Sequence, residues 1–365
     1  MENYNARYAR HYSLKDFGKE GQQKLSDAKV LVIGAGGLGC PVLQYLTASG
    51  IGTIGIVDHD VIALSNLQRQ VLYTTEDIGK SKAVVANQKL SLLNPEIQIN
   101  TYTLEINSKN ALAIISEYDI IVDCTDNFAS RYLINDACVL LKKPLVFGAI
   151  YQYEGQVAVF NSEINGSRIN YRNLFPHPPK PDEVQDCNEA GVLGILPGII
   201  GMMQASEIIK LLTGIGEVLT GKLLTFSLLN YEIYIMEIAE NAVSHLIPKD
   251  EIEFKNTDYN WLCGLSNSKI ETLEPSDFLS KISNLDTIII DVREKHELPK
   301  ANFPNLNIPL SELSENLSEL RDSNILVFCQ SGKRSLKAAE ILLEKFGTTK
   351  KISHLKGGII ALQVK

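Results

Sequence analysis

The sequence predicts an α/β protein built on a doubly wound, mostly parallel sheet with an antiparallel extension, joined to a smaller second α/β domain. Three observations carry this prediction. Apolar strand-like runs alternate with helix-like segments through the first 150 residues, strand-like runs follow one another after residue 153, and alternation resumes near residue 287. Alternating strands and helices favour a parallel sheet covered on both faces, whereas consecutive strands favour antiparallel pairing.

The first predicted element is a strand that leads through a tight turn into a helix. Residues 30–33 are β-branched and aliphatic, the glycines that follow are spaced G-x-G-x-x-G, and helix-forming residues come next. We expect Gly34 to permit the turn, Gly36 to let a phosphate approach the backbone, and Gly39 to let helix and strand pack closely. Gly37 belongs to the same turn. The helix N-terminus can then hold an anion, as in a Rossmann-like nucleotide site.

The second predicted strand places an acid where a nucleotide site needs one. Residues 54–57 end at Asp58, about twenty residues after the glycine motif, where a ribose hydroxyl is held. Asn66 and Asp126 also fall at the ends of predicted strands. Because ligands of doubly wound sheets bind at the carboxyl ends of the strands, we expect these side chains to border one site.

The remaining elements follow in chain order. The parallel part continues with a helix at 79–93, strands at 97–102 and 119–123, a helix at 128–141 and a strand at 145–148. Strand-like runs at 155–160 and 222–237 flank a helix near 198–212, and the proline-rich segment 175–182 is a loop or crossover. The second domain has strands at 287–291 and 324–328, a helix at 335–346 and a turn at 356–358. We therefore divide the chain into a first domain at 1–245, a linker at 246–270 and a second domain at 271–365.

Composition narrows the class of protein. The chain has 365 residues, 35 of them basic and 43 acidic, and its net charge of -8 argues against a general nucleic-acid binder. The N-terminus lacks the apolar core of a signal peptide, and no apolar run approaches membrane-spanning length. We expect a cytoplasmic protein without nucleic-acid or membrane partners. The six widely spaced cysteines suggest thiols rather than disulfides.

The charged residues near the expected site favour a triphosphate over a dinucleotide. An NAD-dependent oxidoreductase would explain the glycines and Asp58 but not Asn66, Arg69, Lys82 and Asp126. A triphosphate under attack needs cations on the transferring phosphoryl group and a carboxylate that helps to hold Mg²⁺. Taken singly, each of these residues could also be an ordinary surface ion-pair residue.

Several motifs, in the right order, resemble those of the bacterial ubiquitin-activating-enzyme-like adenylyltransferases. The resemblance covers roughly residues 5–240, and within the family it is strongest to the molybdopterin-synthase and the thiamine sulfur-carrier adenylyltransferases. It implies that ATP activates a ubiquitin-like sulfur carrier whose C-terminal Gly–Gly carboxylate attacks the α-phosphate, giving an acyl-adenylate and pyrophosphate. The motifs are Gly34–Cys40, Leu64–Gln70, Asp123–Asn127, and Glu189–Val192 with Leu196–Gly198.

The resemblance assigns a role to each matching position. It implies that Asp58 holds the ribose and that Asp126 supports Mg²⁺ and catalysis. Arg10 matches an arginine that reaches the ATP of the other protomer, which implies a homodimer, although local sequence alone fits a solvated helix face. The residues implied as phosphate contacts are Asn66, Arg69 and Lys82.

Two cysteine features bear on the same resemblance. Cys187 resembles a crossover-loop cysteine that some family members link to the carrier or to a sulfur donor, and a bystander thiol is an equal alternative. Family members also carry two Cys-x-x-Cys pairs that bind a structural zinc. Here the first pair aligns with Asn170 and Asn173, and the second aligns with Asn260 and Cys263. Because asparagine is a poor ligand for tetrahedral zinc, we predict no zinc site.

The C-terminal domain contains a cysteine loop suited to sulfur chemistry. Residues 329–335, Cys-Gln-Ser-Gly-Lys-Arg-Ser, follow an apolar strand and open a helix, so backbone N–H groups and the two cations favour a thiolate or persulfide on Cys329. A buried structural cysteine is the alternative. With the motifs at 291–294, 307–309 and 355–358, residues 270–365 resemble a rhodanese domain. That resemblance implies a Cys329 persulfide loaded by a donor such as a cysteine desulfurase.

These features leave three hypotheses for the function. The first is a carrier adenylyltransferase fused to a sulfurtransferase, serving molybdopterin, thiamine or another thiolated product. The second is the NAD-dependent oxidoreductase, which ATP binding without NAD binding would exclude. The third is a non-catalytic carrier-binding module, which the missing zinc ligands suggest and pyrophosphate exchange would exclude.

Overall fold

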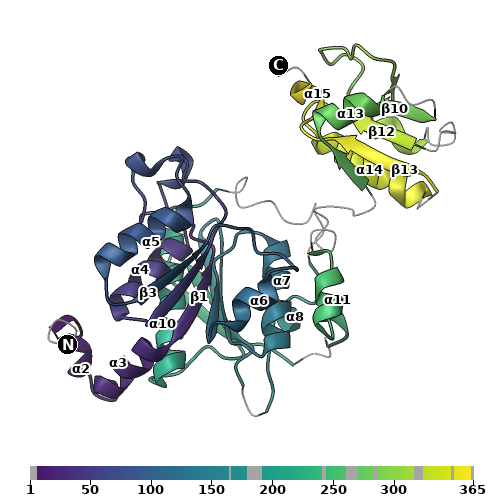
Figure 1. Ribbon diagram of the computed structural model, residues 1–365. Helices are drawn as coiled ribbons and strands as arrows, with labels where there is room; N and C mark the ends of the chain where they lie inside the picture. The colour runs from purple at the N-terminus through teal and green to yellow at the C-terminus, as the bar shows by residue number, and fades with distance from the viewer. Residues whose placement is uncertain are drawn as a thin grey trace. The chain divides into compact units, whose positions relative to one another are not determined.

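The computed structural model describes most of the chain, and its contacts divide the chain into two compact units, Met1–Cys263 and Gly264–Lys365. Each unit has its own sheet and its own hydrophobic core (Figure 1). The described residues are 6–163, 166–178, 191–240, 244–259, 270–282, 286–315, 324–346 and 349–362.

The first unit is built on one 8-stranded sheet with the strand order β3-β2-β1-β4-β5-β6-β7-β8. Strands β3 to β5 pair in parallel, and β5 to β8 pair antiparallel, as the sequence predicts. Because β1 lies between β2 and β4, the chain reverses its winding beside β1, which is where doubly wound folds bind ligands. The strands are β1 Lys29–Ile33, β2 Thr53–Val57, β3 Gln98–Tyr102, β4 Ile120–Asp123, β5 Leu145–Tyr151, β6 Glu154–Phe160, β7 Lys222–Ser227 and β8 Ile233–Glu237.

Helices cover both faces of this sheet, and one hydrophobic core lies under each layer (Figure 1). One layer contains α3 Gly18–Asp27, α4 Gly39–Ser49, α5 Lys82–Leu93 and α10 Ile195–Thr213. The other contains α6 Ala111–Ser116, α7 Phe128–Leu141, α8 Tyr171–Leu174 and α11 Glu251–Asn256. Short helical turns complete the unit: α2 Ala9–Tyr12, η1 Leu64–Asn66, η2 Thr75–Asp77 and η3 Ser244–Leu246.

Helix α10 corrects one expectation. By length and hydropathy it is apolar enough to cross a membrane, so the statement that no apolar run approaches that length is wrong. Its polar side chains have partners inside the unit: Gln204 Nε2 donates to the Asp123 carbonyl at 2.8 Å, and Glu207 Oε2 accepts from Leu219 N at 2.8 Å. Packed against α4, β5 and β6, this helix serves as a core helix of the fold.

The expected linker also begins later than the composition suggests. Residues 251–259 include α11, and both Phe254 and Tyr259 are buried in the core that contains α7. Tyr259 donates a hydrogen bond to Asp136 Oδ2 at 3.0 Å. Although the composition of this segment is polar and rich in turn residues, the buried Phe254 and Tyr259 pack it against the first unit.

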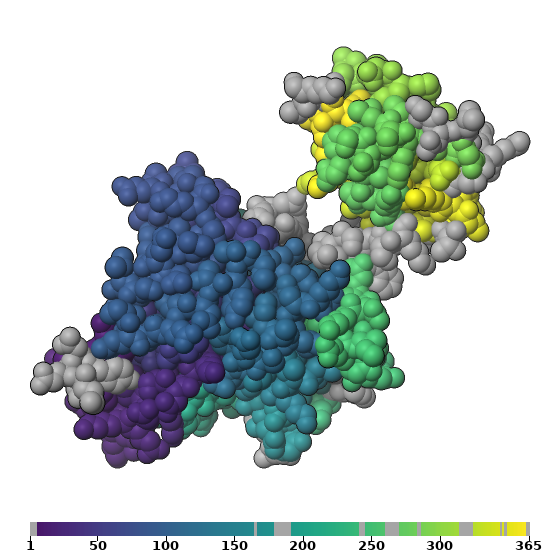
Figure 2. Space-filling view, in the orientation of Figure 1, coloured from purple at the N-terminus to yellow at the C-terminus, as the bar shows by residue number. Residues whose placement is uncertain are grey.

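The segment between β2 and α5 lies on the surface of the first unit, where it is blue in Figure 2. Although most of it is polar, it exposes four apolar side chains whose relative exposures lie between 42% and 69%. These residues are Val61, Leu64, Val71 and Ile78.

The second unit has a 5-stranded parallel sheet in the order β11-β10-β12-β13-β9. Its strands are β9 Ile270–Leu273, β10 Thr287–Asp291, β11 Leu306–Asn307, β12 Asn324–Phe328 and β13 Lys351–Leu355. Its helices are α13 Pro275–Lys281, η4 Leu310–Glu315, α14 Lys333–Phe346 and α15 Gly358–Ala361. Strand β9, which begins at the last residue of the expected linker, and helix α13 were not predicted. A four-residue strand gives little periodic signal.

Candidate functional site

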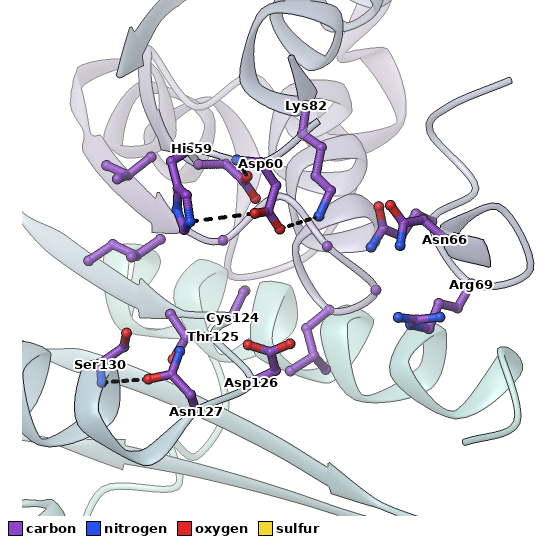
Figure 3. A pocket seen from close by; sticks show the side chains of 18 of the residues that line it. His59, Asp60, Asn66, Arg69, Lys82, Cys124, Thr125, Asp126, Asn127 and Ser130 are labelled. Atoms are coloured by element: carbon purple, nitrogen blue, oxygen red, sulfur yellow. Dashed lines mark hydrogen bonds and ion pairs between the residues drawn. The ribbon is translucent and has the colours of Figure 1, made fainter. Parts of the chain in front are cut away.

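A cavity of about 520 Å³ opens at the carboxyl ends of β1, β2 and β4 (Figure 3). Most of the nucleotide-site residues chosen from the sequence border it, although they come from separate parts of the chain. They are Gly34, Gly36, Gly37, Asp58, Asn66, Arg69, Lys82 and Asp126. Gly39 and Arg10 are not among the residues that line it.

The glycine turn has the geometry that its spacing predicts. Gly34 has a φ of +98°, and a Cβ there would lie 2.6 Å from the Cys124 carbonyl oxygen. At Gly39 a Cβ would lie 2.0 Å from the Gly34 oxygen, so that glycine lets α4 begin against the turn. Gly36 is different, because its Cβ position meets only the Gln70 side chain at 3.5 Å and otherwise faces open space. The turn therefore leaves room for a ligand at Gly36.

Asp58 already holds part of the site together. Its two carboxylate oxygens accept hydrogen bonds from Ala35 N at 2.7 Å and from Asp60 N at 2.8 Å. Burial raises the pKa of Asp58, although the Ala35 N–H and the nearby Lys82 act in the opposite direction. A carboxylate has about four acceptor positions, so Asp58 keeps capacity for ligand hydroxyls.

Two cationic side chains border the cavity from different elements. Lys82, the first residue of α5, is 7% exposed in its side chain and pairs with Asp60 at 2.7 Å. Arg69 donates to the Ser65 carbonyl at 3.1 Å, which leaves most of its guanidinium donors available. In Figure 3 the guanidinium of Arg69 and the amide of Asn66 point into the space that Lys82 and Asp126 border. This arrangement suits a polyanionic ligand.

Asp126 stands in an exposed loop whose shape is fixed by a buried neighbour. Asp123 ends β4 with 1% exposure and accepts hydrogen bonds from both Thr125 N and Thr125 Oγ1. After Asp126, Asn127 caps α7 by accepting from Ser130 N at 2.9 Å. Asp126 forms no hydrogen bond or ion pair with any described residue. Its carboxylate is therefore free to meet a ligand.

Two polar residues of the cavity wall that the sequence did not predict are buried and have unpaired side-chain atoms within the described part of the chain. Arg131 on α7 is 9% exposed, lies over the rings of Phe128 and Phe147, and has an Nε without a hydrogen-bond partner among the described residues. Gln70 is 3% exposed, and its Oε1 is likewise unpaired within the described part of the chain. For Arg131 a signal was available, since a residue four positions after the Asn127 cap lies one helical turn into α7, on the same side as the strand end.

The other candidate residues named from the sequence do not line the cavity or lie outside the described residues. Arg10 lies exposed on α2, and its expected contact with a second protomer stays a prediction. Cys187 and the pair Asn260 and Cys263 lie outside the described residues. Cys40 is buried, and burial raises the pKa of its thiol to about 12, which makes it an inert core residue.

The asparagines that replace one cysteine pair fold into a local cap. Asn170 caps α8 by accepting from Arg172 N at 2.9 Å, and Asn173 Oδ1 accepts from Asn170 N at 2.9 Å. Between them, the buried Arg172 pairs with Asp136 through two hydrogen bonds of 2.8 Å and 2.7 Å. Since Tyr259 also binds Asp136, this polar network joins α7, α8 and the segment that follows α11. The expectation that this chain binds no zinc stays a prediction.

A second site lies in the second unit, on the loop between β12 and α14. Cys329 is fully buried, and Gly332 N donates to its Sγ at 3.1 Å. The loop rests on the first residues of α15: Ile359 N donates to the Cys329 carbonyl at 2.8 Å, and a Cβ on Gly358 would lie 2.5 Å from the loop backbone. The loop therefore directs the Gly332 N–H at its own sulfur atom.

Arginine and carboxylate pairs frame this cysteine loop. Arg293, 1% exposed in its side chain, binds Asp291 and also donates to Gln330 Oε1 in the loop at 3.2 Å. Arg334 binds Glu297 through hydrogen bonds of 2.6 Å and 2.7 Å, and this contact lowers the pKa of Glu297 to about 2. The loop is thus held on both flanks by charged pairs.

Taken together, the two sites define a nucleotide-binding α/β enzyme joined to a sulfur-handling α/β domain. Comparison with known proteins supplies the family. The chain belongs to the ThiF family, whose model matches residues 8–246, and a rhodanese-like domain matches residues 274–364. It is an adenylyltransferase with sulfurtransferase activity.

One relative matches nearly the whole chain, and two further proteins match a part of it. The chain is 41% identical to the probable adenylyltransferase/sulfurtransferase MoeZ of Mycobacterium tuberculosis over 370 residues, which covers 98% of this chain and 92% of the relative. It is 48% identical to the sulfur carrier protein adenylyltransferase of Thermus thermophilus over 261 residues, 71% of this chain and 96% of the relative. A crystal structure of E. coli MccB with ATP matches with a TM-score of 0.56 and 25% identity, covering 66% of this chain and 74% of that one.

Proposed function

We propose that this enzyme adenylylates the C-terminal glycine of a ubiquitin-like sulfur-carrier protein with ATP and then supplies sulfur to the activated carboxylate through a persulfide on Cys329. The observation that carries the proposal is the convergence of Arg69, Lys82 and Asp126 on the cavity beside the glycine turn. That the Thermus relative is named for a sulfur carrier supports the choice of substrate. A molybdopterin-synthase-type carrier is the first choice and a thiamine-type carrier the second.

The proposed positions of ATP follow from the cavity wall. The phosphates lie at Gly36, where a Cβ would meet open space, within reach of Asn66, Arg69 and Lys82. The ribose lies at Asp58. The carrier carboxylate attacks the α-phosphorus, the α–β phosphoanhydride bond breaks, and pyrophosphate leaves. Because a carboxylate is already ionised at neutral pH, the step needs no general base.

Charge neutralisation is the main task of the protein in this step. Lys82 has to exchange Asp60 for a phosphate oxygen, and Arg69 and the buried Arg131 add positive charge to the same wall. Asp126 fits a Mg²⁺ ion, since it is an exposed carboxylate without a described partner, and Mg²⁺ in such sites takes one or two carboxylates together with phosphates and water. Bound there, the ion would neutralise charge on the phosphate oxygens.

The rhodanese-like unit completes the proposed reaction. The Cys329 thiolate attacks the outer sulfur of a donor persulfide, such as one on a cysteine desulfurase, so that Cys329 gains the persulfide and the donor leaves as a thiolate. The persulfide sulfur then attacks the carbonyl carbon of the acyl-adenylate and AMP departs, which leaves the carrier joined to Cys329 as an acyl disulfide. A second thiol attacks Cys329 Sγ, so that the carrier leaves as a thiocarboxylate and a disulfide forms between that thiol and Cys329. The Gly332 N–H at 3.1 Å from Sγ stabilises the negative charge on sulfur.

Two further parts of the proposal concern partners. We infer a homodimer in which Arg10 of one protomer reaches the phosphates of the other. The exposed apolar side chains of Val61, Leu64 and Val71, close in sequence to Asn66 and Arg69, support a second protein surface beside the cavity. Cys187 is proposed as the crossover-loop thiol that engages the carrier or the donor.

The proposal is tested with carriers from the same genome. Each is purified intact and without its last glycine, and ATP–pyrophosphate exchange is measured with the full-length enzyme. We expect exchange only with an intact carrier, a carrier–AMP adduct by mass spectrometry, and binding of ATP but not NAD. Exchange that is independent of the terminal glycine, or no exchange with any carrier, would contradict the proposal.

A further inference from the structure

A chain of polar side chains runs from the exposed Thr272 on strand β9 to the buried sulfur of Cys329, and the reaction described above does not use it. Cys329 Sγ lies 3.6 Å from Ser335 Oγ, which lies 3.4 Å from His354 Nδ1. On the other side of the ring, His354 Nε2 lies 3.1 Å from Thr272 Oγ1. The side chains of Ser335, His354 and Thr272 thus form a hydrogen-bonded series behind the cysteine loop.

The fold brings these groups together from four separate elements. Cys329 follows β12, Ser335 lies in the first turn of α14, and His354 and Thr272 are paired residues of β13 and β9. Cys329 and Ser335 are fully buried, His354 is 6% exposed, and Thr272 is exposed. Among Cys329, Ser335 and His354, where there is so little water, the direction of each hydrogen bond is decided by the chain itself.

Counting protons shows which direction suits a charged sulfur. Burial lowers the pKa of His354, so the ring is neutral at pH 7 and carries one N–H. If the Thr272 hydroxyl donates to Nε2 of His354, the single ring proton of His354 is on Nδ1, and this N–H points at Ser335. With the thiol form of Cys329, the Ser335 hydroxyl can donate to the Gly332 carbonyl at 3.0 Å and accept from the S–H.

Loss of the thiol proton changes what Ser335 must do. An anionic sulfur can only accept, so the Ser335 hydroxyl has to turn from Gly332 toward Sγ. Its oxygen then needs a new donor, and His354 Nδ1–H is the described donor within 3.4 Å. We propose that His354 is a positioning residue for Cys329: it donates to Ser335, so that Ser335 donates to the sulfur anion of the thiolate and persulfide.

This inference rests on the proposed role of Cys329 as the residue that holds the persulfide. It adds a function for His354 and Thr272, which lie outside the motif of the cysteine loop. Two arginines that flank the loop are already paired, since Arg334 binds Glu297 and Arg293 binds Asp291. The Thr272–His354–Ser335 chain is therefore a second, uncharged means of stabilising the sulfur anion, beside the Gly332 N–H.

The test measures the alkylation rate of Cys329 by iodoacetamide at pH 7 in the full-length protein, read on the tryptic peptide that ends at Lys333. Loss of a hydrogen bond to a charged group predicts about a tenfold slower rate in Ser335→Ala and about a fivefold slower rate in His354→Leu. His354→Asn, which can place an amide N–H near the position of Nδ1, should return to within about twofold of the parent protein. The Cys329 persulfide lifetime should fall in the same order.

Coupling separates this role from a structural one. Adding His354→Leu to Ser335→Ala should slow alkylation no further, because His354 acts through Ser335. Thr272 is the side chain of this hydrogen-bonded chain that lies farthest from the sulfur, so Thr272→Val should slow the alkylation of Cys329 about twofold. This variant keeps the test decisive even if His354→Leu fails to fold. Ser353→Ala, on the opposite face of β13, is the matched control and should leave the rate unchanged.

The outcomes distinguish this inference from the proposed function. Unchanged alkylation in Thr272→Val, additive effects of the Ser335 and His354 substitutions, or His354→Asn as slow as His354→Leu would each overturn the positioning role. Sulfur transfer that persists in Cys329→Ser would instead remove Cys329 from the reaction. Pyrophosphate exchange should be unchanged in every His354 and Thr272 variant.

Discussion

The two units contain the same local device, a strand that passes through a glycine-containing turn into a helix, and use it in opposite ways. After β1 the turn leaves an open bay at Gly36, and the cavity in front of it is bordered by side chains from other elements. After β12 the turn closes on its own Cys329 side chain, toward which Gly332 N donates. The first arrangement suits an anion that arrives and leaves, and the second suits an anion that stays covalently attached.

The supports of the two turns differ accordingly. A Cβ on Gly34 or on Gly39 of the first turn would lie 2.6 Å or 2.0 Å from backbone oxygen atoms, so the chain packs closely at both glycines, which fixes the walls and leaves the centre empty. In the second, the turn at Gly357 and Gly358 lies directly under the loop. The first turn faces an open space that a ligand can enter, whereas the second surrounds its own cysteine side chain. This difference separates a binding turn from a reactive one.

The largest expected effect is the loss of the reactive sulfur. Cys329→Ser should abolish sulfur transfer, because serine cannot form a persulfide, and should leave carrier-dependent pyrophosphate exchange unchanged. The measurement is thiocarboxylate formation on the carrier, by mass spectrometry, beside the exchange assay. If exchange falls together with transfer, the two turns do not work independently and the comparison fails.

The next effect concerns the cavity in front of the first turn. Asp126→Ala should reduce pyrophosphate exchange by about 10² to 10³-fold, the size typical for loss of one electrostatic contact in a transition state. The fold should stay intact, because Asp126 is exposed and has no described partner. Asp27→Ala, an exposed acid at the end of α3, is the control. Normal exchange in Asp126→Ala would remove this residue from the site.

Alanine at one glycine of each turn tests the comparison directly. Gly36→Ala places its Cβ in open space, so we expect about a tenfold higher KM for ATP without loss of thermal stability. Gly332 has a φ of +92°, and its Cβ would lie 3.0 Å from Gly357 N, so Gly332→Ala should destabilise the second unit by about 1–3 kcal/mol and impair sulfur transfer. Destabilisation by Gly36→Ala would show that the first turn is not an open bay.

Local signals allowed most of this architecture to be predicted. The strand before the glycines, the strand that ends at Asp58 and the helix that starts at Phe128 are all found within one or two residues of their expected positions. Each combines a short apolar run with a start or stop residue, and those signals depend on neighbours in sequence. Helix α11 was missed because Phe254 and Tyr259 gain their meaning only from α7, which is distant in sequence.

The same difference between local signals and contacts with distant elements applies to the residues of the site. The glycines, Asn66 and Asp126 could be chosen because motif spacing fixes where they stand relative to a strand end. Gln70 and His354 could not, since a glutamine or a histidine inside an apolar pattern gives no sign of what it faces, and the Asn127 cap indicates only the side of α7 on which Arg131 lies. Their importance depends on burial and on missing or aligned partners, which arise when distant elements pack.

The smallest expected effect concerns the charged pair beside the second turn. Since Arg334 lowers the pKa of Glu297 to about 2, the pair stabilises the folded unit above the usual carboxyl pKa of 4.5, and this contribution is lost as the pH falls from 4.5 toward 2. Both side chains are partly exposed, at 35% and 22%, so the contribution is at most about 1 kcal/mol. Glu297→Gln should therefore destabilise the second unit slightly at pH 7 and have no effect near pH 2.

Hydrogen exchange of peptides from β12 and α14, comparing parent and variant at the same pH, measures this difference in the second unit alone. Glu312→Gln, which removes the pair that Glu312 forms with the exposed Lys295 at 3.3 Å, provides a matched control with a smaller expected change. A Glu297→Gln effect that is as large at pH 2 as at pH 7 would mean that Glu297 contributes by packing rather than by charge. The charge of the Arg334–Glu297 pair would then have no part in holding the loop closed, and of the two charged pairs only Arg293 with Asp291 would remain as an electrostatic support.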